Sequence, residues 1–200
     1  LWEFTDPDLG YTIGKPLIAR LKDGTWAAIF GNGYNSSNDR AMLFVVDLAT
    51  GALIGKVDTG VGEAALPNGL SGPVGLARTE DGKEFLAVIY AGDLHGNLWK
   101  FDLSDKTEVD GEDRWGSVDF AGSPLFAASG PSGQAQPITV TPELARHDLG
   151  GYLVLFGTGR YFATSDPEDL SAQSIYAIWD RGETVGGRGT LQQQEIRVEQ

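Results

Sequence analysis

The residues best suited to chemistry are carboxylates gathered in short acidic segments, because oxygen ligands around a glycine-containing turn can bind Ca²⁺. Three segments have this composition: Glu80-Asp81-Gly82-Lys83-Glu84, Asp110-Gly111-Glu112-Asp113 and residues 166–169. None has the Asp-x-Asp-x-Asp-Gly spacing that places alternate side chains around one ion. A solvated loop is the simpler interpretation of each segment. We therefore assign no metal site and no cofactor, and keep Glu80, Asp81 and Glu84 as the calcium candidates.

Other residue types that support catalysis lack the partners that catalysis needs. The two histidines, His95 and His147, are far apart in the sequence, and each stands in a segment typical of a turn. No Gly-x-Ser-x-Gly motif is present, and a chain without cysteine has no thiolate nucleophile. The glycine-rich residues 157–160 and 186–189 lack the spacing of a dinucleotide-binding loop. The chain is predicted not to be an enzyme.

The net charge of the chain excludes some classes of binding partner. It contains 15 Lys and Arg against 28 Asp and Glu, which gives a net charge of -13. Such a surface repels nucleic acids and anionic lipids, whose binding needs clustered basic residues. No stretch supplies the roughly 18 consecutive apolar residues of a spanning helix. We therefore predict neither nucleic-acid binding nor membrane insertion.

A repeated order of strand-like segments predicts the fold. Each of three units begins near a proline (Pro16, Pro73 and Pro137), continues with an apolar run that ends at an aromatic residue, and then alternates apolar and polar residues. The 28 glycines, about twice the usual share of ~7%, fit the turns between such strands. The apolar runs are residues 26–31, 86–92 and 152–157, the alternating segments are 43–47, 98–102 and 175–179, and a weaker fourth strand is expected at 53–57, 115–120 and 191–198.

Four strands in each of three similar units favour an all-β fold, a β-propeller fragment of about three four-stranded blades. The blades are expected at about residues 16–60, 70–120 and 136–200. Residues 1–15 are expected to hold the outer strand of a preceding blade, at residues 1–4, and a linker. Propellers close with about four or more blades, so these blades are predicted to belong to one larger domain. A β-sandwich is the alternative.

Loops are expected where the repeat is stretched, at residues 32–40, 104–113, 127–136 and 164–174. Exposed loops carry binding more often than strands do. The partner-contact surface is therefore predicted at residues 32–40, with Asn32, Tyr34 and Asn35, and at residues 127–136.

Three strings, which lie in the same order in the chain, resemble the C-terminal β-propeller of the type IV pilus biogenesis factor family, the PilC/PilY-type tip-associated adhesins of Gram-negative bacteria. The resemblance spans nearly the whole chain. The strings are Phe30-Gly31-Asn32-Gly33-Tyr34-Asn35-Ser36, Tyr90-Ala91-Gly92-Asp93-Leu94-His95-Gly96-Asn97-Leu98-Trp99-Lys100-Phe101-Asp102-Leu103 and Phe156-Gly157-Thr158-Gly159-Arg160-Tyr161.

The resemblance implies a non-enzymatic scaffold and adhesion module that supports pilus assembly and twitching motility, opposes pilus retraction and aids surface attachment. It implies a secreted protein, located in the periplasm, at the outer membrane or at the pilus tip. The implied partners are pilins or minor pilins, other pilus-assembly proteins and a host surface. Members of the family often carry a calcium loop just before the second string, and here Asp81 and Gly82 match that loop while Ala87 replaces its last Asp.

A different class of protein is suggested by Asp47, Thr50 and Gly51. Their spacing resembles the Asp-x-x-Thr-Gly end of the repeats in quinoprotein dehydrogenase propellers, which makes such an enzyme the alternative function. The motif occurs once, and Leu53 and Ile54 stand where those repeats have a Trp. A glycan-binding, lectin-like module is a further alternative that the sequence leaves open.

Overall fold

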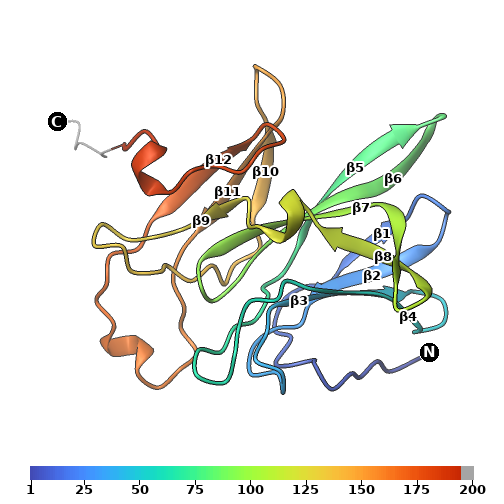
Figure 1. Cartoon of the computed structure of the whole chain (residues 1–200), viewed down its shortest axis with the longest axis horizontal. Helices are drawn as coiled ribbons and strands as arrows, with labels where there is room; N and C mark the ends of the chain where they lie inside the picture. The colour runs from blue at the N-terminus through green and yellow to red at the C-terminus, as the bar shows by residue number, and fades with distance from the viewer. Residues whose placement is uncertain (195–200) are drawn as a thin grey trace.

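The computed structural model describes residues 1–194, and within that range it contains β-strands and three 3-10 turns but no α-helix (Figure 1). The strands form three antiparallel sheets, each in chain order, which confirms the predicted all-β fold. The first sheet holds β1 (Leu17–Arg20), β2 (Trp26–Gly31), β3 (Met42–Asp47) and β4 (Leu53–Asp58). The second holds β5 (Val74–Glu80), β6 (Lys83–Gly92), β7 (Asn97–Val109), β8 (Glu112–Val118) and the short β9 (Phe126–Ala127), which pairs with β7. The third holds β10 (Glu143–Arg146), β11 (Tyr152–Gly157) and β12 (Ile175–Asp180), and the 3-10 turns are η1 (Phe120–Gly122), η2 (Asp166–Glu168) and η3 (Arg188–Thr190).

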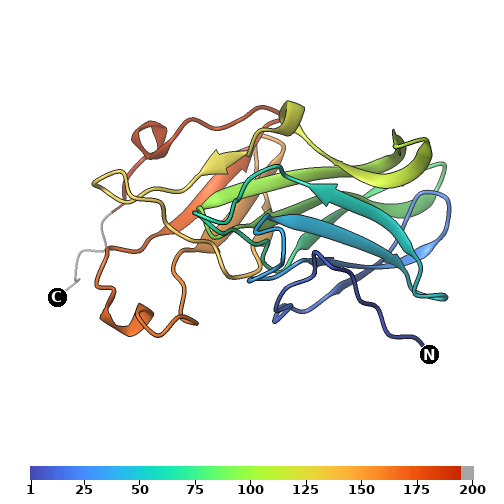
Figure 2. The ribbon, with the colours of Figure 1, turned by 60° about the horizontal axis from the view of Figure 1, so that its bottom comes forward.

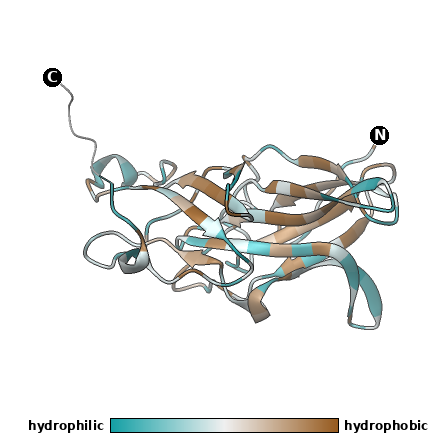
Figure 3. Cartoon of the chain, turned by 90° about the horizontal axis from the view of Figure 1, so that it is seen from above, coloured by the Kyte–Doolittle hydropathy of each residue, from teal (hydrophilic) through white to brown (hydrophobic). Residues whose placement is uncertain are grey.

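The inner part of the second sheet, in β6 and β7, is buried on both faces, because it lies between the other two sheets (Figure 2). Successive residues of a strand point to opposite faces. Ile89 accordingly packs with the first sheet, against residues such as Ile29 and Val45, while Tyr90 packs with the third sheet, against Phe156. This arrangement explains the continuous apolar run of β6, since both of its faces meet a hydrophobic core. Hydrophobic residues follow the strands in Figure 3, and hydrophilic residues gather in the loops and at the hairpin ends.

Two tight turns extend the second sheet beyond what the sequence predicts. Asp81 and Gly82 join β5 to β6, and Asp110 and Gly111 join β7 to β8, with positive φ at all four residues. Positive φ at both central residues matches the right-handed twist of a two-residue hairpin, and Asp-Gly tolerates it. The loop predicted at residues 104–113 is therefore wrong, because β7 and β8 run through most of it as paired strands.

The third unit departs from the predicted positions of its strands. The segment around Pro137 is not its first strand, because β10 starts at Glu143 and Ile138 instead forms an isolated bridge with Gly159. The fourth strand predicted at residues 191–198 is not formed by Leu191 to Gln194, and its remainder lies outside the described residues.

The N-terminal residues lie along one face of the first sheet. Phe4 packs edge-on against Phe30 and Phe44, with ring centroids 5.9 and 5.8 Å away. Trp2 donates a hydrogen bond from Nε1 to the Leu48 carbonyl (2.9 Å). The outer strand predicted at residues 1–4 would need a neighbouring strand that none of the three sheets supplies, so it stays a prediction. The prediction that these blades belong to one larger propeller domain also stays a prediction.

Candidate functional site

A glycine followed by a polar residue ends the second main strand of every unit: Gly31-Asn32, Gly92-Asp93 and Gly157-Thr158. Beside each of these turns lies the segment that leads into the same unit. Isolated bridges join the two, and they form the pairs Tyr11 with Tyr34, Leu70 with Asp93, and Ile138 with Gly159. The repeat is therefore present in the loops as well as in the strands, and the loops of the three units converge on one region of the molecule.

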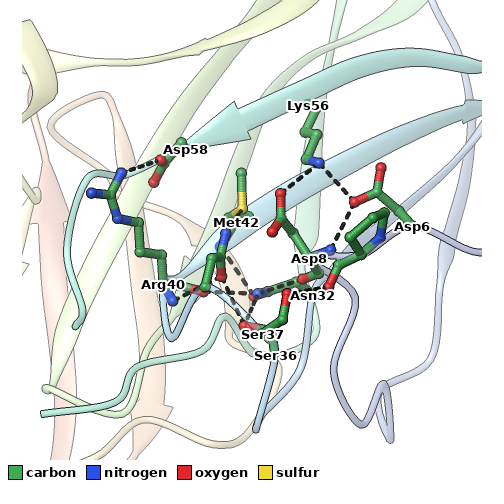
Figure 4. Close-up of polar contacts among 11 residues, drawn as sticks. Asp6, Asp8, Asn32, Ser36, Ser37, Arg40, Met42, Lys56 and Asp58 are labelled. Carbon is green, nitrogen blue, oxygen red and sulfur yellow. Dashed lines mark hydrogen bonds and ion pairs between the residues drawn. The ribbon is translucent and has the colours of Figure 1, made fainter. Parts of the chain in front are cut away.

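Asn32 organises the first of these loops from the inside (Figure 4). Its side chain is fully buried. Nδ2 donates to the carbonyls of Arg40 (2.7 Å) and Asp8 (3.2 Å), and Oδ1 accepts from the backbone N–H groups of Met42 and Leu70 (both 3.0 Å). A buried amide satisfied on both ends holds a loop in one conformation. Asn32 thus stabilises the loop, and its side chain is not accessible to a binding partner.

The other two predicted contact residues lie differently. Asn35 is exposed at the tip of the loop, with a left-handed backbone at φ 62°. Tyr34 is largely buried, and its ring stacks on Phe162 with centroids 4.6 Å apart. Burial, helped by the negative charge of Asp93, raises the pKa of the Tyr34 hydroxyl to about 12, so the phenol is neutral at physiological pH. The predicted role of Tyr34 and Asn35 in partner contact stays a prediction.

Asp93 is the counterpart of Asn32 in the second unit, and it is also fully buried. Its Oδ1 accepts from the backbone N–H groups of His95 (2.9 Å) and Asn97 (2.8 Å). Its Oδ2 accepts from Trp99 Nε1 (2.8 Å) and from the side-chain amides of Asn68 and Asn97 (both 2.9 Å). Several converging donors can stabilise a buried carboxylate. His95 lies in the resulting tight turn, as the sequence predicts.

A second polar cluster fastens the N-terminal segment to β4 (Figure 4). The Lys56 ammonium lies 2.7 Å from Oδ1 of Asp6 and 2.7 Å from Oδ2 of Asp8, and 5.4 Å from the centre of the Phe44 ring. Burial alone would lower the pKa of Lys56, but the hydrogen bonds to Asp6 and Asp8 outweigh it and raise the pKa. Ser37 adds a hydrogen bond to the Pro7 carbonyl (2.6 Å). Residues 6–8 are thus held against β4 and the loop after β2.

An open cleft of about 320 Å³ lies where the segment before β1, the loop after β2 and the loop after β11 meet. We call it the aromatic cleft, and it is lined by the rings of Tyr11, Tyr34, Tyr161 and Phe162, with Lys15 on its wall. Its volume is at the lower end of the range for ligand sites. Of these residues, sequence reasoning named Tyr34, and it missed the site because the other rings lie in two distant segments, at residue 11 and at residues 161–162. The one feature of the sequence that could have indicated the site is the presence of aromatic residues in loops, outside any predicted hydrophobic core.

The loop that carries Tyr161 and Phe162 is held by one aspartate. Oδ2 of Asp166 accepts from the backbone N–H groups of Phe162 (2.9 Å) and Ala163 (2.7 Å), and Oδ1 lies 3.0 Å from Nε of Arg160. The two backbone hydrogen bonds are the main reason that the pKa of Asp166 is lowered. An ionised Asp166 therefore keeps the two rings at the cleft.

The calcium candidates are not brought together around one point. Glu80 stands opposite Lys83 in the β5–β6 ladder and forms an ion pair with Lys22 (3.2 Å). Glu84 stands opposite Thr79, so its side chain lies on the other face of the hairpin. Asp81 occupies the turn. Within residues 1–194, no three Asp, Glu or His side chains are arranged to hold one metal ion. The assignment of no metal site to these residues stays a prediction.

The motif of Asp47, Thr50 and Gly51, which suggested a dehydrogenase, forms a tight turn. Oδ1 of Asp47 accepts hydrogen bonds from Ala49 N (2.9 Å), Thr50 N (2.8 Å) and Thr50 Oγ1 (2.9 Å), and Gly51 follows with φ 77°. Such bonds are typical of aspartate at a tight turn. The spacing of these residues is thus explained by the connection between β3 and β4, with no cofactor.

A charged network joins the second sheet to the third. Asp180 on β12 accepts a hydrogen bond from the Tyr90 hydroxyl (2.6 Å) and pairs with Lys100 (2.9 Å), which also lies 3.3 Å from Asp119. Burial opposes ionisation of Asp180, but the hydrogen bonds from Tyr90 and Lys100 lower its pKa. Burial and the adjacent Asp180 raise the pKa of Tyr90. The network thus connects β6 and β7 of the second sheet to β12 of the third.

Comparison with known proteins covers nearly the whole chain. Residues 4–200 match the family model of the PilY1 β-propeller domain. The chain is 46% identical to a type IV pilus biogenesis factor PilY1 homolog of Xylella fastidiosa over 99% of its own length, and 43% identical to PilY1 of Pseudomonas aeruginosa over all of it. It spans 14% and 19% of the lengths of these two relatives.

A solved structure agrees in fold. The crystal structure of the Pseudomonas aeruginosa PilY1 C-terminal domain superposes with a TM-score of 0.79 at 40% sequence identity. The match covers 94% of this chain and 42% of the solved one. The predicted β-propeller fragment is thereby confirmed. Within the described residues, no helix has the length and apolarity needed to cross a bilayer.

Proposed function

The chain belongs to the PilY1 β-propeller family, and from that membership we propose that it is the propeller module of a type IV pilus biogenesis factor. In this role it acts as a non-enzymatic scaffold that supports pilus assembly, opposes retraction and aids surface attachment. The observation that carries the proposal is the match over almost the full chain to proteins named as pilus biogenesis factors.

The location and partners follow from the same proposal. A pilus biogenesis factor acts outside the cytoplasm of a Gram-negative bacterium, in the periplasm, at the outer membrane or at the pilus tip. Its partners are pilins or minor pilins and other pilus-assembly proteins, with a host surface as a further contact. Tyr34, Asn35 and the loop at residues 127–136 are the proposed contact surface, together with the aromatic cleft that Tyr34 lines.

The organisation of the chain supports a scaffold. Two hydrophobic cores hold three sheets together, and buried polar residues such as Asn32 and Asp93 fix the loops between strands. Loops held from inside present their exposed residues in one geometry, which lowers the entropic cost of binding.

Genetic complementation tests the proposal. A strain that lacks the parent gene should lose surface pili and twitching, and the wild-type gene should restore both. Removing the retraction motor as well should restore pili if the protein mainly opposes retraction, and should not if assembly itself needs it. The control is the parent gene with Asp113→Ala, at an exposed residue of the β8 hairpin. Normal piliation and twitching in the deletion strain would contradict the proposed role.

A further inference from the structure

One wall of the aromatic cleft has backbone groups without partners. Thr12, Gly14 and Lys15 are exposed, and no backbone hydrogen bond engages any of them within residues 1–194. On either side the chain is paired: Tyr11 bridges to Tyr34, and Leu17 begins the β1–β2 ladder. Ile13 between them donates its N–H to the Tyr11 carbonyl (3.1 Å), and the chain bends at Gly14. The free N–H and C=O groups are therefore those of Thr12, Gly14 and Lys15, and such groups can pair with the backbone of another chain.

The charge of the cleft differs from that of the chain. The chain has a net charge of -13, yet Lys15 is the one charged residue that lines the cleft in the part of the chain that the structure describes. Lys15 has no ion-pair partner among those residues, whereas Lys22, Lys56, Lys100 and Lys106 each have at least one. A lone cation beside neutral rings and hydroxyls is complementary to a single carboxylate.

Three of the four rings of the cleft are exposed, and Phe162 is held in place. Tyr161 is 78% exposed, Tyr11 67% and Phe162 46%. Asp166 anchors the backbone of Phe162, and Tyr34 stacks on its ring. Aromatic rings that are already ordered offer contact area at little entropic cost, which is the reason that peptide-binding grooves use them.

We infer that the aromatic cleft binds an extended, acidic peptide segment of a partner protein. The peptide backbone pairs with the free groups of Thr12, Gly14 and Lys15. An apolar or aromatic side chain of the peptide enters between the rings of the cleft, and a carboxylate of the peptide faces Lys15. The free backbone groups favour a peptide over an acidic glycan, since a peptide backbone supplies an N–H donor and a C=O acceptor at each residue. The inference rests on the proposed function in one respect, that the segment comes from a pilus-assembly protein.

The test selects peptides on the whole 200-residue chain. A displayed random peptide library is enriched on the wild type. The most enriched peptide is then synthesised with a fluorescent label, and its Kd is measured by fluorescence anisotropy. The variants are Lys15→Glu, Tyr161→Ala and, as the matched control, Lys83→Glu, which makes the same charge change at the exposed tip of the β5–β6 hairpin. Circular dichroism verifies that all variants are folded.

The inference expects enriched peptides that carry Asp or Glu beside an apolar residue. Lys15→Glu and Tyr161→Ala should each weaken binding at least about tenfold, while Lys83→Glu should leave Kd unchanged. Methylation of the peptide backbone nitrogens should also weaken binding. The inference is overturned if no peptide is enriched, if the enriched peptides lack acidic residues, or if Lys15→Glu has no more effect than Lys83→Glu. Binding of an oligouronate that depends on Lys15, without peptide binding, would instead identify a glycan site.

These outcomes are separable from the proposed function. Peptide binding is measured without pili, so its failure leaves the complementation result standing. Normal piliation in the deletion strain would remove the proposed function and leave the binding curves as they are.

Discussion

Buried polar side chains do much of the ordering in this chain. Asn32 holds the loop after β2 and accepts a hydrogen bond from Leu70, in the segment that leads to the second sheet. Asp93 holds the loop after β6 and accepts one from Asn68, in that same segment. Each therefore connects its own loop to another part of the chain. Removal of either side chain would leave buried donors without acceptors, which costs more than a simple loss of contact.

Asp93→Ala is expected to lower the free energy of unfolding by about 3 kcal/mol, because the buried donors of Asn68, Asn97 and Trp99 lose their acceptor. Urea unfolding followed by tryptophan fluorescence measures the change. The matched control is Asp113→Ala at an exposed strand position, which should change stability by less than about 0.5 kcal/mol. Equal effects of the two variants would show that the buried hydrogen bonds contribute little.

Calcium titration is expected to give no saturable heat from the β5–β6 hairpin. Glu80 is engaged with Lys22, and Glu84 lies on the opposite face, so few oxygen ligands can reach one ion. Isothermal calorimetry on the metal-stripped chain, with Asp81→Ala and Glu84→Ala for comparison, measures this. Heat that disappears in either variant would contradict the expectation and establish a calcium site there.

The sequence predicts which residues are polar at these turns but not which are buried. The hydrogen bond from Leu70 to Asn32 spans 38 residues, and that from Asn68 to Asp93 spans 25. Such distant partners leave no local pattern, so Asn32 was expected at the surface. Tyr11, Tyr34 and Tyr161 line one cleft for the same reason: they come from three separate segments, and their spacing along the chain does not show that they meet.

At the scale of elements, the loop between β11 and β12 depends on an ionised Asp166. Its pKa is lowered in the folded state, so its stabilising effect is present above the unfolded value near ~3.9 and is lost as pH falls through the folded pKa. We expect the Phe162 and Ala163 amides to lose protection from hydrogen exchange as the solution is acidified below about pH 4. NMR exchange measurements across this range follow the change.

Asp166→Asn provides the control for this pH dependence. The amide cannot ionise, and one of its two ends donates instead of accepting, so the loop should be looser at neutral pH and insensitive to acid. Acid-dependent exchange that persists in Asp166→Asn would assign the effect to another carboxylate, such as Asp169, whose pKa is also lowered by hydrogen bonds.

Elements with a strong local pattern were predictable. The apolar runs within β2, β6 and β11 are short, uncharged and followed by a turn after a glycine, which favours a strand. Of these three strands, β6 is the one with residues in both hydrophobic cores. The extension of β7 and β8 was not, because residues 104–113 are charged and polar and read as a loop. Their strands form because the Asp110-Gly111 turn fixes a hairpin that projects from the core.

At the scale of the whole molecule, the Tyr90, Lys100 and Asp180 network is expected to couple the second and third sheets. Tyr90→Phe removes the hydroxyl from Asp180 and should cost about 1 kcal/mol of stability, and Asp180→Asn together with Tyr90→Phe should cost less than the sum of the single changes. Hydrogen exchange in β10–β12 should increase more than in β1–β4.

Tyr152→Phe is the matched control for this cycle. Tyr152 lines the same space between the sheets, and no hydrogen-bond partner of its hydroxyl occurs in residues 1–194. The change should therefore be within about 0.5 kcal/mol. Full additivity of the Tyr90 and Asp180 variants would mean that the sheets are held by their hydrophobic contacts alone.

The attachment of residues 1–11 to the first sheet has a mechanical consequence. Its contacts follow one another along the chain, from Trp2 and Phe4, through Asp6 and Asp8 on Lys56, to the bridge between Tyr11 and Tyr34. A tensile load applied to Leu1 away from the sheet would break them one at a time, as a zipper opens, so the peak force is that of a single contact. The three sheets would carry the full load only after the last of these contacts has broken. Residues 1–11 would therefore extend under force before the sheets unfold.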